Sequence, residues 1–169
     1  MLNRTTIALG GIALLAAPLL APPLPRLAWN ATPSAPIGLY AISPHAIPVE
    51  GSLVLVRPPP TLARLFAARG YLPANVPLLK RVSAHSGQRV CRAGRRVTVD
   101  DRLVAVALAH DRRGRPLPVW QGCRTLRFDQ LLVLSPGVRD ALDGRYFGPL
   151  PRSALVGVAT PLWTRSRRP

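Results

Sequence analysis

Short apolar runs separated by glycine, proline and polar residues dominate the chain beyond residue 37. Runs of about four to eight residues with such boundaries are typical of β-strands. They predict strands near 53–56, 76–82, 89–91, 96–99, 103–108, 131–134 and 154–159. Leu62, Leu65 and Phe66 share one helical face and Gly70 can close the end, which predicts one short helix over 61–70. The pattern therefore predicts an all-β or mostly-β domain.

An uncharged, mostly apolar segment runs from Thr5 to Leu24, directly behind Arg4. About 20 helical residues, rising roughly 1.5 Å each, cross a hydrocarbon core of roughly 30 Å. The segment is either a cleaved secretory signal or an uncleaved transmembrane anchor. Pro22 directly after Ala21 is a poor cleavage context and favours the anchor. In both cases the rest of the chain is expected on the periplasmic side of the cytoplasmic membrane, with the amino terminus in the cytoplasm.

The chain divides into three parts by composition. Residues 1–25 form the signal or anchor helix, and residues 26–36 form a proline-rich linker. Residues 37–169 form the β-rich domain, which is long enough to bury its own core.

The charge of the chain is extreme, with a formal net charge of +16. Lys80 is the only lysine among 23 basic residues, so all the others are arginines. A buried ammonium group can lose its proton, whereas a guanidinium group effectively never does. The single lysine therefore indicates a need for an amine that deprotonates, unless one lysine merely escaped a compositional drift toward arginine.

Cysteine and histidine are sparse. Cys91 and Cys123 fit no zinc motif, but in an exported domain they can form one disulfide, and in the cytosol they would be buried thiols. His45, His85 and His110 lack the spacing of metal ligands. We therefore expect no metal and no other cofactor.

The surroundings of Lys80 are apolar. Leu78 and Val82 would share its strand face, and Arg81 adds a like charge. Burial and a neighbouring positive charge both lower the pKa of a lysine amine. The alternative is a strand lysine that points to solvent.

Ser34 lies a short distance beyond the predicted membrane segment, between Pro33 and Pro36, and Gly38 follows. A serine hydroxyl can be activated as a nucleophile by a lysine instead of a histidine. Taken alone, such a serine is more often a turn residue.

Four short motifs occur in a fixed order along the chain. They are Ser34-Ala35-Pro36, Gly51-Ser52-Leu53-Val54, Lys80-Arg81-Val82 and Asp143-Gly144-Arg145-Tyr146-Phe147-Gly148-Pro149. Their order resembles the signal peptidase I family, in which a serine followed closely by proline comes just after a transmembrane helix. The Gly38-Leu39-Tyr40 that follows the first motif is similar to the TraF-type branch, the peptidases of conjugative transfer systems.

The resemblance implies a signal-peptidase-like β catalytic domain behind one transmembrane helix. It implies that Ser34 is the nucleophile and Lys80 the general base. The Ser34 backbone N–H and the Thr32 hydroxyl would stabilise the oxyanion, although Thr32 can also be an ordinary linker residue.

Two positions depart from the usual family pattern or stay open. Many relatives carry a serine that orients the lysine two residues before Asp143, where this chain has Ala141. The TraF-type resemblance implies a functional aspartate at Asp143. An equally weighted alternative is a structural salt bridge between Asp143 and Arg145.

The function implied is endopeptidase cleavage of exported precursor proteins, with pilin maturation in conjugative transfer as the specific case. The acyl-enzyme would be captured by water or by the pilin's own amine. One alternative is general signal peptidase I. Another is a basic, non-enzymatic protein that binds anionic lipid or nucleic acid. Dispersed arginines with few aromatics between them argue against nucleic acid, whereas anionic membrane lipid is an expected partner.

Overall fold

The computed structural model describes residues 26–165. The predicted anchor segment, residues 1–25, lies outside the described residues. Within residues 26–165, no helix combines the length and the apolar character needed to span a membrane.

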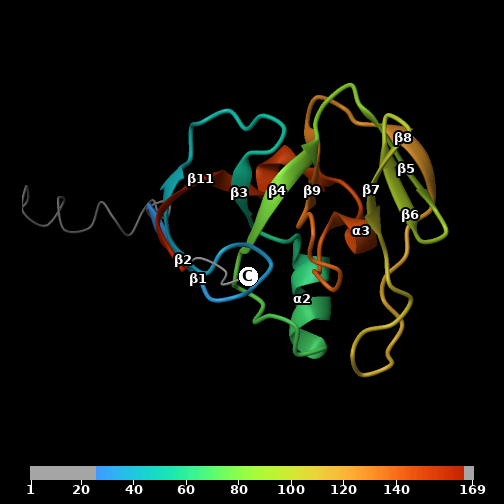
Figure 1. The fold of residues 1–169 in the computed structure, drawn as a ribbon, viewed down its shortest axis with the longest axis horizontal. Helices are drawn as coiled ribbons and strands as arrows, with labels where there is room; N and C mark the ends of the chain where they lie inside the picture. Colours follow the sequence, from blue (N-terminus) through green and yellow to red (C-terminus); the bar gives the residue numbers. More distant parts are fainter. Residues whose placement is uncertain (1–25, 166–169) are drawn as a thin grey trace, which may run out of the picture.

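A seven-stranded antiparallel sheet forms the larger part of the domain (Figure 1). Its strand order is β1-β2-β11-β3-β4-β9-β10. In chain order the strands are β1 Leu27–Asn30, β2 Gly38–Ser43, β3 Leu53–Val56, β4 Leu78–Ala84, β9 Gln130–Leu134, β10 Leu150–Pro151 and β11 Leu155–Thr164. The four residues of β3 are all buried, as their continuous apolar run predicts for a central strand.

A second sheet of four strands, in the order β7-β6-β5-β8, is inserted into the chain between β4 and β9. Its strands are β5 Arg89–Ala93, β6 Arg96–Val99, β7 Arg102–Val106 and β8 Gly122–Thr125. Cys91 of β5 lies opposite Cys123 of β8, and a disulfide joins the two, with their Cα atoms 4.0 Å apart.

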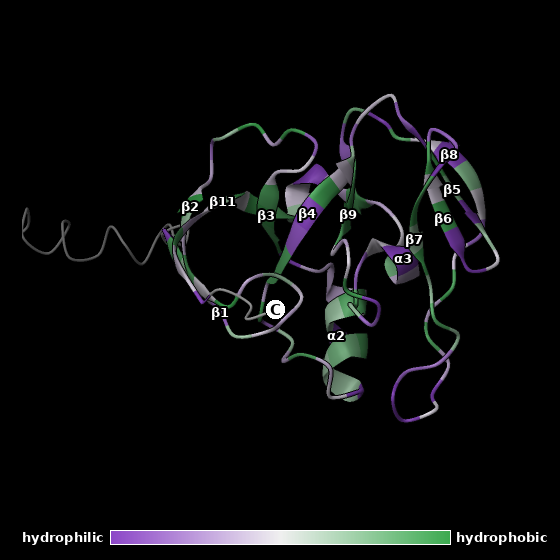
Figure 2. Cartoon of the chain, in the orientation of Figure 1, coloured by the Kyte–Doolittle hydropathy of each residue, from purple (hydrophilic) through white to green (hydrophobic). Residues whose placement is uncertain are grey.

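Three short helical segments complete the domain: α2 Pro60–Ala68, α3 Gly144–Phe147 and the 3₁₀ turn η1 Arg152–Ala154. Pro60 begins α2 at a position where the backbone N–H would have no helical partner. Phe66 carries the buried face of α2 into the main core, against Val54 and Val56. Figure 2 shows α2, coloured mostly as apolar, beneath the larger sheet.

The prediction of a mostly-β domain is confirmed, and the predicted helix corresponds to α2. The expected linker at 26–36 is described differently by the structure, because residues Leu27–Asn30 pair with β2 as an edge strand. Prolines on both sides of this segment conceal the strand in the sequence, since proline is read as a strand breaker. The pattern also missed β8, whose residues are all exposed and carry no apolar signal.

Gly38 allows β2 and β11 to approach closely. A Cβ atom at this position would lie 2.1 Å from the Trp163 carbonyl oxygen. Only glycine fits such a backbone contact, so the glycine that begins the Gly-Leu-Tyr motif serves the packing of the sheet. This contact fixes the start of β2, which follows the loop that carries Ser34 in the chain.

Candidate active site

Lys80 lies in an interior strand of the larger sheet. Its strand β4 is hydrogen-bonded to β3 on one side and β9 on the other, and Lys80 is paired with Val54. Leu78 and Val82, on the same strand face, belong to the main core. The lysine is only 3% exposed, so the prediction that its strand face is apolar and buried is confirmed.

The amine of Lys80 has a defined partner. Its Nζ donates a hydrogen bond to Ser135 Oγ over 3.0 Å. Ser135 directly follows β9. Because β4 and β9 are antiparallel and Arg81 is paired with Leu134, the residue before Arg81, Lys80, lies opposite the residue after Leu134, Ser135. The contact therefore follows from the register of β4 and β9.

Burial lowers the pKa of Lys80 from 10.5 to about 8. The charge of Asp143 acts in the opposite direction, and that of Arg145 lowers the pKa further. The like charge was expected from Arg81, and this expectation was wrong. Arg81 is exposed and donates to the Gly51 carbonyl, because alternate strand residues point to opposite faces. With a pKa near 8, about one tenth of the Lys80 amines are neutral at pH 7.

Asp143 and Arg145 form a buried ion pair at the start of α3. Asp143 is fully buried and accepts from Arg145 Nε at 2.8 Å and Nη2 at 3.0 Å. Asp143 Oδ2 also accepts from the Ser135 backbone N–H at 2.8 Å. The salt bridge considered as one interpretation of Asp143 is thus present. No hydrogen bond joins Asp143 to Lys80 in residues 26–165, and Asp143 reaches the lysine by way of Ser135.

Close packing against β9 requires a glycine at position 144, directly after Asp143. A Cβ there would lie 2.7 Å from Leu132 Cδ1 and 2.8 Å from the Val133 carbonyl oxygen. The close approach of α3 to β9 is what brings the ion pair against the Ser135 backbone.

Asn30 organises the loop that carries Ser34. Its Nδ2 donates to the carbonyls of Thr32, Ala35 and Pro36, at 2.9, 3.1 and 3.0 Å. Its Oδ1 accepts from both the backbone N–H and the hydroxyl of Thr32. One buried side chain therefore fixes the loop on both sides of Ser34.

The Ser34 hydroxyl lies 3.1 Å from the Thr32 hydroxyl. In the part of the chain that the structure describes, no hydrogen bond joins Ser34 to Lys80. Both side chains line a single cavity of about 670 Å³, together with Thr32. Apolar side chains supply much of its wall, including Leu55, Leu78, Leu79, Val76 and Leu142.

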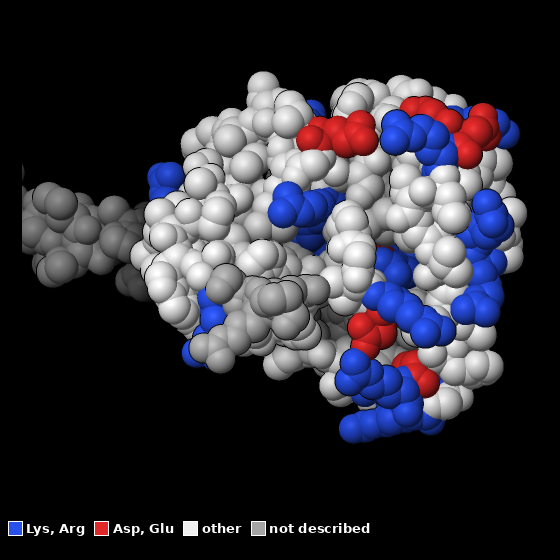
Figure 3. Space-filling model, in the orientation of Figure 1, with Lys and Arg blue, Asp and Glu red and all other residues white. Residues whose placement is uncertain are grey.

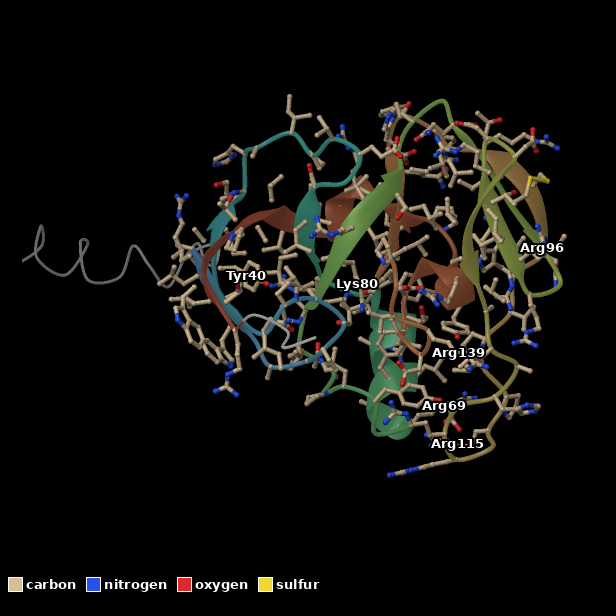
Figure 4. The ribbon with its side chains drawn as sticks, viewed as in Figure 1. Tyr40, Arg69, Lys80, Arg96, Arg115 and Arg139 are labelled. Atoms are coloured by element: carbon tan, nitrogen blue, oxygen red, sulfur yellow. A yellow bond between two sulfur atoms is a disulfide. The ribbon has the colours of Figure 1, made fainter. Side chains whose placement is uncertain are left out.

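The cavity extends from β1 to a charged end at residues 111–115. Figure 4 places Lys80 near the middle of the molecule, between Tyr40 on one side and Arg69 and Arg115 on the other. A buried amine of lowered pKa and a serine hydroxyl in one partly apolar cavity are the groups that acyl transfer requires.

No cluster of three or more histidine, cysteine, aspartate or glutamate residues that could hold a metal occurs within the described range 26–165.

Ser135 and Asn30 were not identified from the sequence. A polar residue directly after a buried strand, as Ser135 follows 131–134, is a signal that could have drawn attention to it. Asn30, two residues before a threonine, fits the pattern of an asparagine that bonds to its own loop. Neither signal reveals the partner, because Ser135 lies 55 residues from Lys80 in the chain.

The sequence matches the family described as "Signal peptidase, peptidase S26" over residues 2–163. The chain therefore belongs to the S26 signal peptidase family, which confirms the resemblance found in its four motifs. This family membership implies serine peptidase activity and argues against a basic protein that only binds.

Within the family the chain belongs to the TraF-type branch. The probable conjugal transfer protein TraF of Sinorhizobium fredii (strain NBRC 101917 / NGR234) is 39% identical over 149 residues, covering 80% of this chain and 76% of its own length. The conjugal transfer protein TraF of Agrobacterium fabrum (strain C58 / ATCC 33970) is 37% identical over 145 residues, covering 80% of this chain and 81% of its own length. Among solved structures, a signal peptidase I from Enterococcus faecalis V583 has a TM-score of 0.41 and 14% identity. It covers 68% of this chain and 98% of its own.

Proposed function

We propose that this protein is a membrane-anchored serine endopeptidase, with Ser34 as nucleophile and Lys80 as general base. Its substrate is an exported precursor, specifically a pilin subunit matured for conjugative transfer. The observation that carries the proposal is the position of Lys80. The only lysine of the chain is buried and lines the same cavity as Ser34.

The first step is proton transfer from Ser34 to Lys80. The Ser34 hydroxyl turns from Thr32 toward the neutral amine, which accepts its proton as Oγ attacks the scissile carbonyl. The protonated amine then gives this proton to the leaving peptide nitrogen, and an acyl-enzyme on Ser34 remains.

The oxyanion of the tetrahedral intermediate needs hydrogen-bond donors. The Ser34 backbone N–H is one, and the Thr32 hydroxyl is the second. The bonds that Thr32 donates to Asn30 Oδ1 hold this residue beside the nucleophile, which supports the role. Thr32 donates to the intermediate only after its hydroxyl rotates away from Asn30.

The precursor binds in an extended form along the cavity. β1 is the edge strand of the larger sheet, and its residues Ala28, Trp29 and Asn30 line the cavity. An edge strand offers unpaired backbone groups to an added strand.

The decisive test of the substrate is co-expression of the full chain with the pilin precursor encoded at its own locus. Mass spectrometry of the product then reports the cleavage site. A product lighter than the linear fragment by one water indicates capture by the pilin's own amine, whereas the linear fragment indicates hydrolysis. An unprocessed precursor, beside a chain that cleaves other exported proteins, would contradict the pilin assignment and favour general signal peptidase activity.

Cleavage should rise with pH and level off above about pH 8, because only the neutral form of Lys80 accepts the serine proton and its pKa is about 8. Between pH 6 and pH 8 the single-turnover rate is therefore expected to increase by roughly 50-fold. Rates measured with a fixed peptide, under conditions where chemistry limits, check this. A flat profile over this range would contradict Lys80 as the base.

The same pKa affects stability in a defined direction. The unfolded chain keeps the Lys80 proton up to about 10.5, whereas the folded chain loses it near 8. The unfolded state therefore binds more protons between these values, and the contribution of Lys80 to stability improves as pH rises from about 8 to 10.5.

The larger sheet also offers a surface for the membrane. Trp29 and Trp163 stack, with ring centroids 5.8 Å apart, and are 59% and 53% exposed. Leu27 and Leu162 beside them are exposed too, and Arg165 follows β11. In Figure 3 the charged side chains gather mostly on the half of the visible face that lies away from β1, β2 and β11. Tryptophan prefers the membrane interface, and arginine favours anionic headgroups, so this surface suits docking next to the predicted anchor.

Brominated lipids should quench the fluorescence of Trp29 and Trp163 in the full chain reconstituted into anionic vesicles. We expect strong quenching in Trp120→Phe, which keeps this pair. We expect little quenching in Trp29→Phe/Trp163→Phe, which keeps only Trp120 near α3. Equal quenching of the two variants would contradict docking through this surface.

A further inference from the structure

We propose that Ser135 is the positioning residue that directs the amine of Lys80 toward Ser34. The inference rests on the proposed function of Lys80 as the base and adds a residue to it. Its basis is the buried hydrogen bond from Lys80 Nζ to Ser135 Oγ.

Geometry leaves this role to Ser135. Its side chain is 2% exposed and Lys80 is 3% exposed, so the contact is shielded from solvent. Both carboxylate oxygens of Asp143 are occupied by Arg145 and by the Ser135 backbone N–H. Ala141 lines the same cavity but carries no polar side-chain atom. Among the described residues, the Ser135 hydroxyl is therefore the side-chain partner that holds the amine.

A hydroxyl suits this role better than a carboxylate. A general base needs a free lone pair, and a fixed N–H bond on the other side of the nitrogen sets the direction of that lone pair. A carboxylate in direct contact would do this as well, but it would strongly favour the charged ammonium. A neutral hydroxyl orients the amine with a smaller preference for the protonated form.

Ser135 is itself fixed in place. Its backbone N–H donates to Asp143, and its carbonyl accepts from Arg145 Nη2 at 3.3 Å. The ion pair thus forms hydrogen bonds with the Ser135 backbone on both sides of its Cα. By fixing Ser135 in this way, the pair can control the orientation of the Lys80 amine without contacting it.

The test compares Ser135→Ala with Ser83→Ala in the full chain. Ser83 is a half-buried serine on the same strand as Lys80, but on the opposite face of that strand. Its hydroxyl has no hydrogen bond among the described residues. Because Lys80 is the only lysine, ¹³Cε-lysine labelling gives one resonance that titrates with the amine. Peptide cleavage, the melting temperature and this titration are measured for each variant.

We expect Ser135→Ala to lower kcat by about 10- to 100-fold with little change in KM, because the amine loses its orientation. We expect the pKa of Lys80 to fall by about 1, since the ammonium loses an acceptor. Ser83→Ala should leave both values unchanged.

A Ser135→Ala variant with wild-type kcat and an unchanged Lys80 titration would overturn the inference. A lower melting temperature with no change in the titration would also overturn it, because it would assign Ser135 a packing role only. The titration does not depend on peptidase activity. If Lys80 is not the base, Lys80→Arg will retain cleavage, but the titration of Lys80 will still shift in Ser135→Ala. Failure of the proposed function and failure of the proposed contact are therefore distinguishable.

Discussion

Replacing Lys80 with arginine should lower the rate of precursor cleavage by about 100- to 10,000-fold. The substitution keeps a positive charge at the same position but removes an amine that can become neutral, since the pKa of arginine lies above about 12. Removing the nucleophile in Ser34→Ala should have an effect of similar size. Rates of peptide cleavage at a fixed pH near 8, where the Lys80 amine is half neutral, measure both.

Arg81→Lys is the matched control. It adds a lysine one position away, on the exposed face of β4, and should leave the rate within about twofold of wild type because alternate strand residues point away from the cavity. Melting temperatures separate a loss of chemistry from a loss of fold, since arginine is larger than the buried lysine. A folded Lys80→Arg variant that cleaves at the wild-type rate would show that the proton acceptor is another group.

Much of the fold was predictable because burial leaves a local trace in the sequence. β3 and β6 occupy the predicted ranges, since β3 is a continuous apolar run and β6 alternates polar and apolar residues, and both are short segments bounded by turn residues. Lys80 was predictable as a site residue for a different reason. It is the only lysine among 23 basic residues, and it lies in an apolar strand.

Contacts between distant strands left no such trace. β4 and β9 are neighbours in the sheet, but the whole four-stranded sheet lies between them in the chain. The register that brings Ser135 to Lys80 depends on how that insertion folds away from the larger sheet, which local patterns do not encode. The pairing of β1 with β2 was missed for a different reason: the two strands are neighbours in the chain, but the prolines around β1 conceal it as a strand.

Asp143→Asn should reduce the free energy of unfolding by about 3–5 kcal/mol, because it leaves the Arg145 guanidinium buried without a counter-charge. It should also shift the pH profile of cleavage to lower pH, since the charge of Asp143 raises the pKa of Lys80. Denaturant unfolding and pH–rate profiles measure the two effects. Asp140→Asn is the control, because its ion pair with Arg112 is exposed and should contribute less than about 1 kcal/mol.

The double variant Asp143→Asn/Arg145→Leu separates the two interpretations of Asp143. An apolar residue of similar reach removes the unpaired charge, so stability should recover in part. The single variant Asp143→Asn should also cleave more slowly at the pH optimum, because the ion pair no longer fixes the Ser135 backbone. If Asp143 serves only to neutralise Arg145, this loss of cleavage should be reversed together with the loss of stability. We expect cleavage to stay low instead, because the Ser135 carbonyl loses its donor on Arg145. The amide that replaces the Asp143 carboxylate can still accept from the Ser135 N–H, but no guanidinium fixes its orientation, so the bond that directs Lys80 is held less firmly. Full recovery of cleavage in the double variant would show that the ion pair stabilises the fold and has no part in orienting the lysine.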